Sequence, residues 1–147
     1  MKSNRFGRNL VVGCVCKVAT VVHDGGRVVQ LTKLQELAYG EMSGDLSLRT
    51  NGLDEVMQGA GFDTRLSRTF EREMWEKWVL LGAVGGITCL MGGNVGDIAS
   101  APGGADFSLR FLDKVTAGVT AVGRKPSEVF LTDKSSIKAP GIFYDRV

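Results

Sequence analysis

The chain has 147 residues, 44% of them hydrophobic and 23% charged, which is enough material for one ordinary globular domain. Its formal net charge is +2, and because basic and acidic residues are interspersed, no dense basic run predicts a nucleic-acid partner. The longest apolar run, residues 78–91, is shorter than the roughly 20 residues of a membrane-spanning helix and contains three glycines, so we expect no membrane partner either.

The cysteines indicate a reducing compartment. Cys14, Cys16 and Cys89 cannot all pair within one chain, and residues 1–9 are polar and basic without the apolar core of a secretory signal. We therefore predict a cytoplasmic protein. Zinc usually takes about four Cys, His or carboxylate ligands. Because His23 is the only histidine and stands beside a glycine-containing turn, we expect no metal site.

The first third of the chain has the pattern of β-strands. Valine-rich residues 9–22 and β-branched residues 27–31 flank a turn cluster, which predicts a hairpin with a break near Lys17. Residues 36–42 alternate in the same way and are predicted to form a third strand. A small antiparallel sheet of this kind cannot bury both of its faces, so we expect one face to lie against helices.

From residue 46 onward the apolar period changes from two to about 3.6, which predicts helices. The first helix should end near residue 60 and be followed by a short extended link at residues 62–66. Its predicted apolar face consists of Leu53, Val56, Met57 and Ala60.

The longest predicted helix covers residues 68–90, with Ser67 as its N-cap. Its first half is charged, whereas its second half is apolar nearly all round, so we expect its distal end to be buried. Gly82 and Gly86 lie on one face of this helix. Since glycine costs about 1 kcal/mol of helix propensity relative to alanine, we expect another backbone or a ligand to pack closely there in compensation.

The remaining elements complete an α+β fold that is mostly α-helical. Asn94 and Asp97 have the spacing of a cap for a short helix at residues 95–100. An amphipathic helix follows over about 102–122, and a weaker one over about 127–137. The predicted organisation is a small β-sheet segment at residues 1–45, a helical domain at residues 46–139 and an irregular tail at residues 140–147.

Two glycine-rich segments, residues 82–86 and 92–96, could be taken for phosphate-binding loops. A dinucleotide fingerprint places its glycines between a strand and the following helix, so that the helix N-terminus can hold the pyrophosphate. The first segment is predicted to lie inside a helix and the second to follow one, so we interpret both as packing and capping glycines.

Lys77 is the candidate catalytic residue, because it lies where the charged half of the long helix gives way to the apolar half. Partial desolvation there would favour proton transfer, but Glu73 four residues earlier also permits an ordinary surface ion pair, which spacing alone favours. The neighbouring Trp75 and Trp78 are predicted to be core or interface anchors, and Cys89 a small hydrophobe.

The segment EREMWEKWVLLGAVGGITCLMGGNVGDI, residues 71–98, resembles the signature of the ketopantoate reductase C-terminal domain. In that family a Trp-x-Lys helix leads through an apolar run and a threonine to a Gly-acidic turn. Residues 13–45, 58–67 and 101–123 resemble the family's sheet segment, link and next core helix, in the same order, so the resemblance covers about residues 9–139. It implies a helical bundle of the ketopantoate reductase C-terminal type.

The resemblance also implies an activity, the NADPH-dependent reduction of a small 2-oxo acid, typically ketopantoate to pantoate in pantothenate biosynthesis. Lys77 occupies the position of the family's general acid, which favours the catalytic interpretation. Asn94 lies one place before the position of a family asparagine and is a weak substrate-binding candidate, while Leu81 replaces the asparagine one turn after the lysine.

The family's glycine-rich Rossmann domain and its last substrate-binding helix have no counterpart in the sequence. We therefore predict a truncated or free-standing C-terminal substrate-binding domain that holds no cofactor by itself and is inactive without a Rossmann domain. The alternative is a non-catalytic dimerisation or binding module derived from that domain. The expected partners are a second copy, a separate Rossmann-domain chain and a small 2-oxo acid.

Overall fold

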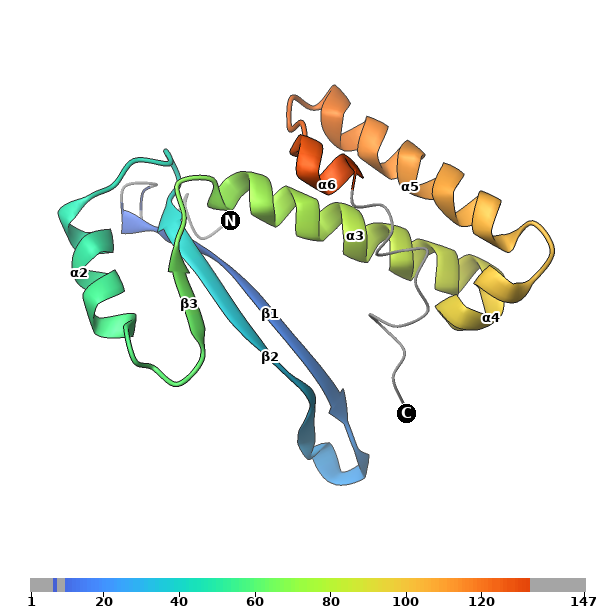
Figure 1. Cartoon of the computed structure of the whole chain (residues 1–147), viewed down its shortest axis with the longest axis horizontal. Coiled ribbons are helices and arrows are strands. Elements are labelled where there is room, and N and C mark those ends of the chain that lie inside the picture. Colours follow the sequence, from blue (N-terminus) through green and yellow to red (C-terminus); the bar gives the residue numbers. More distant parts are fainter. Residues whose placement is uncertain (1–6, 8–9, 133–147) are drawn as a thin grey trace. The chain divides into compact units, whose positions relative to one another are not determined.

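The computed structural model describes residue 7 and residues 10–132 (Figure 1). These residues fall into two compact units that divide after Met74, so the chain passes from the first to the second inside a helix. Helix α2 and strand β3, predicted to belong to the helical domain, lie in the first unit with the sheet. The elements are β1 (Val12–Val22), the 3-10 turn η2 (Asp24–Gly26), β2 (Val28–Glu41), α2 (Leu48–Met57), β3 (Asp63–Leu66), α3 (Phe70–Met91), α4 (Val95–Ser100), α5 (Gly104–Ala121) and α6 (Glu128–Thr132).

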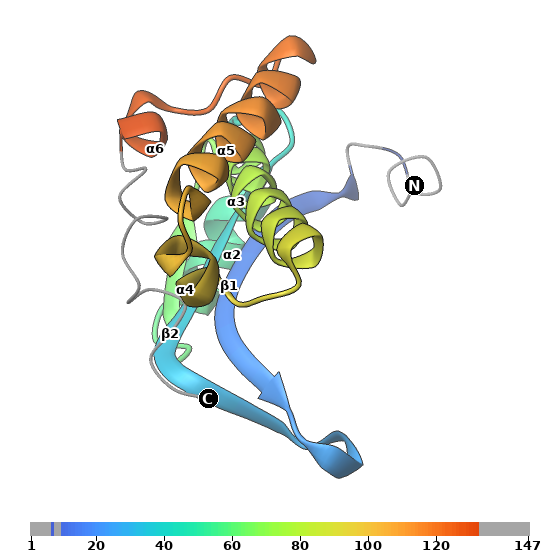
Figure 2. The same cartoon turned by 90° about the vertical axis from the view of Figure 1, so that its right-hand side faces the viewer.

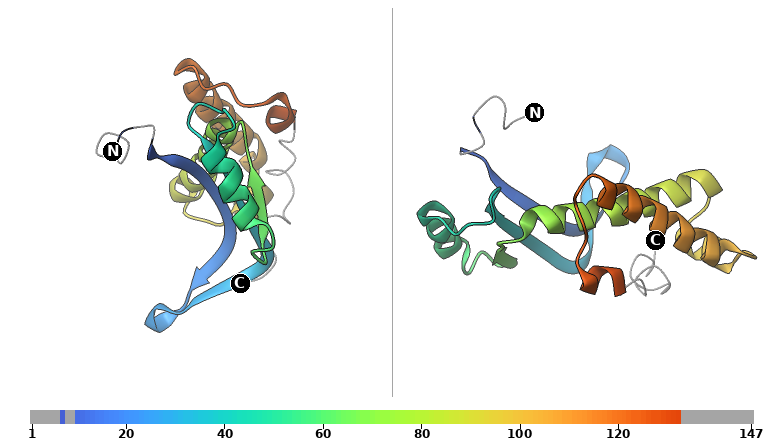
Figure 3. Two further views of the ribbon diagram at one scale, coloured as in Figure 1. Left: turned by 90° about the vertical axis from the view of Figure 1, so that its left-hand side faces the viewer. Right: turned by 90° about the horizontal axis from the view of Figure 1, so that it is seen from above.

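The sheet of the first unit has the order β1-β2-β3. Strands β1 and β2 form the predicted antiparallel hairpin, which bends along its length (Figure 3). The register shifts between Val18 and Thr20, next to the break expected near Lys17. An irregularity of this kind bends a strand and increases its twist, which accounts for the bend of the hairpin.

The third strand differs from the prediction. Residues 36–42 were expected to form it, but β2 continues without interruption to Glu41, and the third strand is β3, which we had interpreted as an extended link. Strand β3 runs parallel to β2, so the sheet is mixed rather than antiparallel. Parallel neighbours need a crossover connection, and α2 lies in the chain between these two strands. Local alternation carries no information about such a pairing.

One face of the sheet packs against the start of α3. Val15 and Ala38 are buried there with Phe70, the first residue of the helix. The approach is so close that a Cβ atom at Gly13 would lie 1.9 Å from the Phe70 ring, and one at Gly40 would lie 2.1 Å from a backbone oxygen of Ser67. Glycine is therefore required at these two positions by space rather than by backbone conformation.

Helix α2 contacts the sheet through polar groups. Its N-cap Ser47 forms a capping box with Thr50, which is fully buried. The hydroxyl of buried Tyr39 donates a hydrogen bond of 2.6 Å to Asp54 of this helix. The predicted apolar face of α2 was wrong, because Val56 is 78% exposed and the helix docks by its polar side instead.

In the second unit α3 and α5 run side by side (Figure 2). Their shared core contains Val79, Ala83, Leu112 and Val119, with Trp75, Phe111, Val115 and Phe130 packed against it. A Cβ atom at Gly86 would lie 2.7 Å from the Phe111 ring, and one at Gly82 would lie 3.9 Å from Val115. The predicted close approach is present at Gly86, where a side chain occupies the space in place of a backbone or a ligand, but the contact at Gly82 is an ordinary one.

The distal end of α3 is not buried as expected, because Leu90 is 67% exposed and Met91 and Cys89 are exposed as well. Helix α5 packs against one side of α3. The second half of α3 is apolar nearly all round, and for this reason we had expected neighbouring elements to bury every side of it.

The described helices of the second unit otherwise follow the sequence closely. Helix α4 has the predicted bounds, and α5 ends in a Schellman cap with Gly123 at φ +79°. The predicted end of the last helix and the tail at residues 140–147 lie outside the described residues. None of the helices described in this structure is both long and apolar enough to span a membrane.

Candidate functional site

Lys77 lies on α3 and is partly buried. It precedes the fully buried Val79 by two residues, which corresponds to about 200° around a helix. Lys77 is therefore on the side of α3 away from the α5 contact. Leu81, four residues further on, lies on the same side and is 51% exposed.

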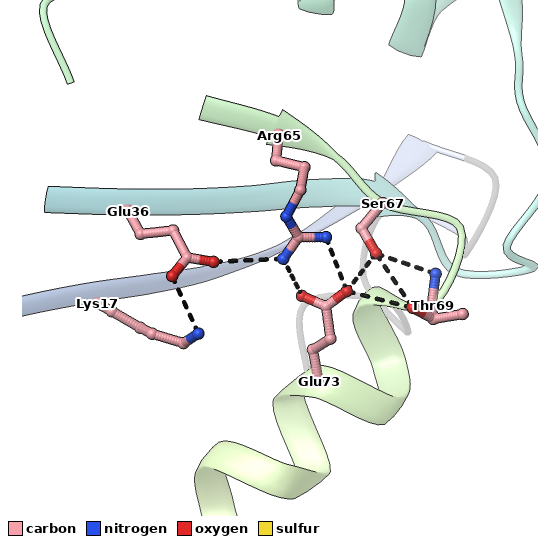
Figure 4. A network of polar contacts seen from close by, with 6 residues as sticks. All are labelled: Lys17, Glu36, Arg65, Ser67, Thr69 and Glu73. Carbon is pink, nitrogen blue, oxygen red and sulfur yellow. Dashed lines mark hydrogen bonds and ion pairs between the residues drawn. The ribbon is translucent and has the colours of Figure 1, made fainter. Parts of the chain in front are cut away.

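One turn before Lys77, the Glu73 carboxylate accepts four hydrogen bonds (Figure 4). Arg65 of β3 donates two of them, from Nη1 to Oε1 at 3.0 Å and from Nη2 to Oε2 at 2.7 Å. The hydroxyls of Ser67 and Thr69 donate the others, at 2.5 and 3.2 Å. A paired guanidinium and two hydroxyls thus fix the first turn of α3 in one geometry.

The same arginine extends the network across the sheet. Arg65 Nη2 also donates to Glu36 Oε1 of β2 at 3.2 Å, and Lys17 Nζ of β1 lies 3.0 Å from Glu36 Oε2 (Figure 4). Two cations and two carboxylates therefore alternate from β1 through β2 and β3 to α3, with balanced charge. Sequence analysis considered Glu73 only as a helical neighbour of Lys77 and missed this network, because its members come from four separate elements.

The network holds both carboxylates in the ionised form. Hydrogen bonds from Arg65 lower the pKa of Glu73 to about 2 against the opposing effect of burial, and Ser67 and Thr69 add to the lowering. Burial raises the pKa of Glu36, but Lys17 and Arg65 outweigh it and leave the pKa below its usual value. These carboxylates accept hydrogen bonds at neutral pH and are unsuited to donate a proton there.

Asn94 is the N-cap of α4. Its Oδ1 accepts a hydrogen bond of 2.8 Å from the backbone N–H of Asp97, and its Nδ2 donates to the Asp97 carboxylate at 2.5 Å. The predicted cap is therefore present, and both polar atoms of the Asn94 side chain take part in it. A substrate contact by Asn94 stays a prediction, and it would compete with Asp97 for the same atoms.

The two tryptophans and the histidine that sequence analysis considered lie in packed or exposed positions that suggest no chemical role. Trp75 packs against the core of the second unit and meets Trp78 edge to face, with ring centroids 5.9 Å apart. Trp78 itself is 54% exposed. His23 is exposed beside the hairpin turn. Within residues 10–132 no three histidine, cysteine, aspartate or glutamate side chains gather as a metal site would require.

The described residues do not fit a dinucleotide. Residues 82–86 lie inside α3, and residues 92–96 run from the end of α3 into α4, so neither segment stands between a strand and a helix. Two described connections join a strand to an α-helix. The one from β2 to α2 contains a single glycine, Gly44, and the one from β3 to α3, residues 67–69, contains none, so neither has a three-glycine fingerprint.

Comparisons with known proteins show which proteins share this fold. No family model matches the chain. The curated uncharacterized oxidoreductase YkpB of Bacillus subtilis is 24% identical over 130 residues, which are 88% of this chain and 43% of that protein. Among solved structures, the 2-dehydropantoate 2-reductase of Geobacter metallireducens aligns with 99% of this chain at a TM-score of 0.78 and 21% identity. This chain has the fold of part of a 2-dehydropantoate 2-reductase.

A second solved 2-dehydropantoate 2-reductase, from Methylococcus capsulatus, aligns with 95% of this chain at a TM-score of 0.72 and 22% identity. The chain spans 49% and 45% of these two structures, about half of their length or less. Since 2-dehydropantoate is ketopantoate, the resemblance predicted from the Trp-x-Lys segment is confirmed as a likeness of fold.

Proposed function

We propose that this chain forms the C-terminal, substrate-binding part of an NADPH-dependent reductase of the ketopantoate reductase type. Lys77 is the general acid in this proposal, and a small 2-oxo acid is the substrate. The observation that carries it is the position of Lys77, at the Trp-x-Lys site of α3 in a fold shared with 2-dehydropantoate 2-reductases.

The chemistry assigned to this chain is the delivery of a proton. Reduction of a 2-oxo acid to a 2-hydroxy acid adds a hydride to the carbonyl carbon and a proton to the carbonyl oxygen. The Lys77 ammonium can hydrogen-bond that oxygen, stabilise the negative charge that develops on it and transfer the proton. Because the described residues do not fit a dinucleotide, the hydride has to come from a cofactor held by another domain or chain.

The residue one turn after Lys77 bears on the choice of substrate. Leu81 lies one turn after the lysine, where the family has an asparagine. An apolar contact at this point favours a 2-oxo acid with an apolar side chain over one with further polar groups.

The direct test measures the binding of ketopantoate to the whole chain, either by titration calorimetry or by NMR of the ligand. We expect weak binding that Lys77→Met abolishes, because methionine keeps the apolar stem of the side chain and removes its charge. Lys114→Met, at an exposed lysine of α5, is the matched control and should bind like wild type. Equal binding by wild type and Lys77→Met would refute the assignment of Lys77.

A kinetic test requires a source of hydride. With a cofactor-binding domain from a ketopantoate reductase joined to this chain, Lys77→Ala should lower turnover by roughly 10² to 10⁴, the usual contribution of a general acid. Full turnover by that variant would show that another group delivers the proton.

A second candidate function is a non-catalytic dimerisation or binding module. The exposed Trp78 and Leu81 favour it, because large apolar side chains clustered on a surface usually mark an interaction site. Absence of ketopantoate binding by the wild-type chain would favour this second function.

A further inference from the structure

Glycine follows an aspartate or an asparagine at two places in the chain, Asp24–Gly25 and Asn51–Gly52. In such a pair the amide nitrogen of the glycine can attack the side-chain carbonyl carbon of the preceding residue and close a five-membered succinimide ring. Glycine permits this attack most readily, because it has no side chain to hinder the approach and its backbone is the least restricted. The structure places the two pairs in different surroundings.

Asp24–Gly25 lies in the turn that joins β1 to β2 (Figure 1), and both residues are exposed. Two backbone hydrogen bonds hold this turn. His23 N–H donates to Arg27 O at 2.9 Å, and Gly26 N–H donates to His23 O at 3.1 Å. Neither bond uses the amide nitrogen of Gly25. Nothing lies within 4 Å of a Cβ atom placed on Gly25, so no neighbouring atom obstructs the rotation that brings this nitrogen to the Asp24 carboxyl.

Asn51–Gly52 is also exposed, but it lies inside α2. In a regular α-helix the amide nitrogen of residue 52 donates to the carbonyl oxygen of residue 48, and Asn51 N–H itself donates to Ser47 O at 2.9 Å. The nitrogen that must attack is therefore held in a hydrogen bond along the helix axis, away from the Asn51 side chain. This pair can react only when α2 opens locally.

We propose that the fold selects Asp24 as a site of spontaneous covalent modification, at which aspartate converts to isoaspartate, and protects Asn51. Attack of the Gly25 nitrogen on the Asp24 side-chain carboxyl carbon forms a C–N bond and releases one water molecule. Addition of water at the α-carbonyl then breaks the original peptide bond and leaves the Gly25 nitrogen attached to the side-chain carbonyl. One water molecule is lost and one is regained, so no oxidant, reductant or cofactor takes part.

The product has a longer main chain. Isoaspartate adds one methylene group between residues 23 and 25 and leaves a free α-carboxylate at the exposed turn. Because His23 is hydrogen-bonded to both Arg27 and Gly26, the chain is held on each side of the added group. The modification therefore disturbs the end of the β1–β2 hairpin. It does not involve Lys77 and is independent of the reaction proposed above.

The experiment compares each site with itself in the folded and the unfolded chain, so that the intrinsic difference between aspartate and asparagine cancels. The whole chain is incubated at pH 7 in water enriched in heavy oxygen, with and without guanidinium chloride, and is then digested with trypsin in ordinary water. Each passage through the succinimide leaves one heavy oxygen atom in the peptide, and chromatography separates isoaspartate from aspartate. Asp24 and Asn51 fall in different tryptic peptides, residues 18–27 and 50–65.

We expect Asp24 to react in the folded chain within about threefold of its rate in the unfolded chain, because the turn needs little opening. Asn51 should react about tenfold or more slowly in the folded chain than in the unfolded one, because α2 must open first. Asp24→Glu is the matched control. Glutamate keeps the charge but would have to close a six-membered ring, so heavy oxygen should no longer enter at residue 24.

Two results would overturn the proposal. If folding slows the reaction of Asp24 as strongly as that of Asn51, the turn does not leave Asp24 open to attack. If folding leaves the rate at Asn51 unchanged, exposure alone decides which residue reacts, and the fold selects neither site.

Discussion

Replacement of Glu73 by glutamine should destabilise the fold and reduce its sensitivity to acid. The Glu73 carboxylate accepts hydrogen bonds from Arg65, Ser67 and Thr69 and joins the first turn of α3 to the sheet. Glutamine keeps the size of the side chain but removes the charge that pairs with Arg65. The variant therefore isolates the electrostatic part of the network from its packing.

The expected magnitude follows from the lowered pKa of Glu73. A fall from 4.5 to about 2 corresponds to about 3 kcal/mol of preference for the ionised form in the folded state. Because the Arg65 side chain is 49% exposed, solvent screens the pair, and we expect a loss of about 1–2 kcal/mol in the free energy of unfolding at pH 7.

The direction of the pH dependence follows from the same value. Since the pKa of Glu73 is lower in the folded chain than in the unfolded one, its stabilisation is complete above about pH 4.5 and is lost as the pH falls toward about 2. Glu41, whose pKa Arg49 and Ser47 lower to about 2, loses its stabilisation in the same range. Glu73→Gln should therefore reduce the acid sensitivity of the chain without abolishing it.

The assay is urea unfolding followed by circular dichroism at pH 7 and at pH 3. Wild type and Glu73→Gln should differ most at pH 7, and the difference should be smaller at pH 3, where part of the stabilisation by Glu73 is already lost. Glu128→Gln is the control, because its pair with Lys125 is exposed on both sides and contributes less than about 0.5 kcal/mol. If Glu73→Gln unfolds like wild type at pH 7, the network does not stabilise the first unit.

Three further predictions concern other parts of the chain. Gly40→Ala places a Cβ atom 2.1 Å from a backbone oxygen of Ser67 and should cost about 2 kcal/mol or more by thermal unfolding, whereas Gly52→Ala, in open space on α2, should stabilise by up to about 1 kcal/mol. Tyr39→Phe leaves Asp54 without its 2.6 Å donor and should cost about 1–2 kcal/mol in the same assay. The isolated chain should not bind NADPH in calorimetric titration, and micromolar affinity would contradict our interpretation of its glycine segments.

The candidate site shows how far sequence reasoning reached. The Trp-x-Lys segment predicted the family whose fold the structure shares, and the spacing of Asn94 and Asp97 predicted the cap of α4. The role of Lys77, which the same segment suggested, stays a prediction. The network around Glu73 could not be predicted in this way. Arg65 and Glu36 are 29 residues apart, and β3, which brings them together, is a four-residue strand with no pattern of its own.

What the sequence alone determined about this protein is local: the hairpin, the capping of α4, the end of α5 at Gly123 and the close approach at Gly86. Each depends on residues a few positions apart or on the missing side chain of a glycine. The tertiary structure alone decided the parallel pairing of β3 and which side of α3 is covered. Apolar residues surround the second half of α3, so composition cannot distinguish its sides. Helix α5 packs against one side of α3 and buries it in the core, and the opposite side of α3 stays exposed because no described element packs against it.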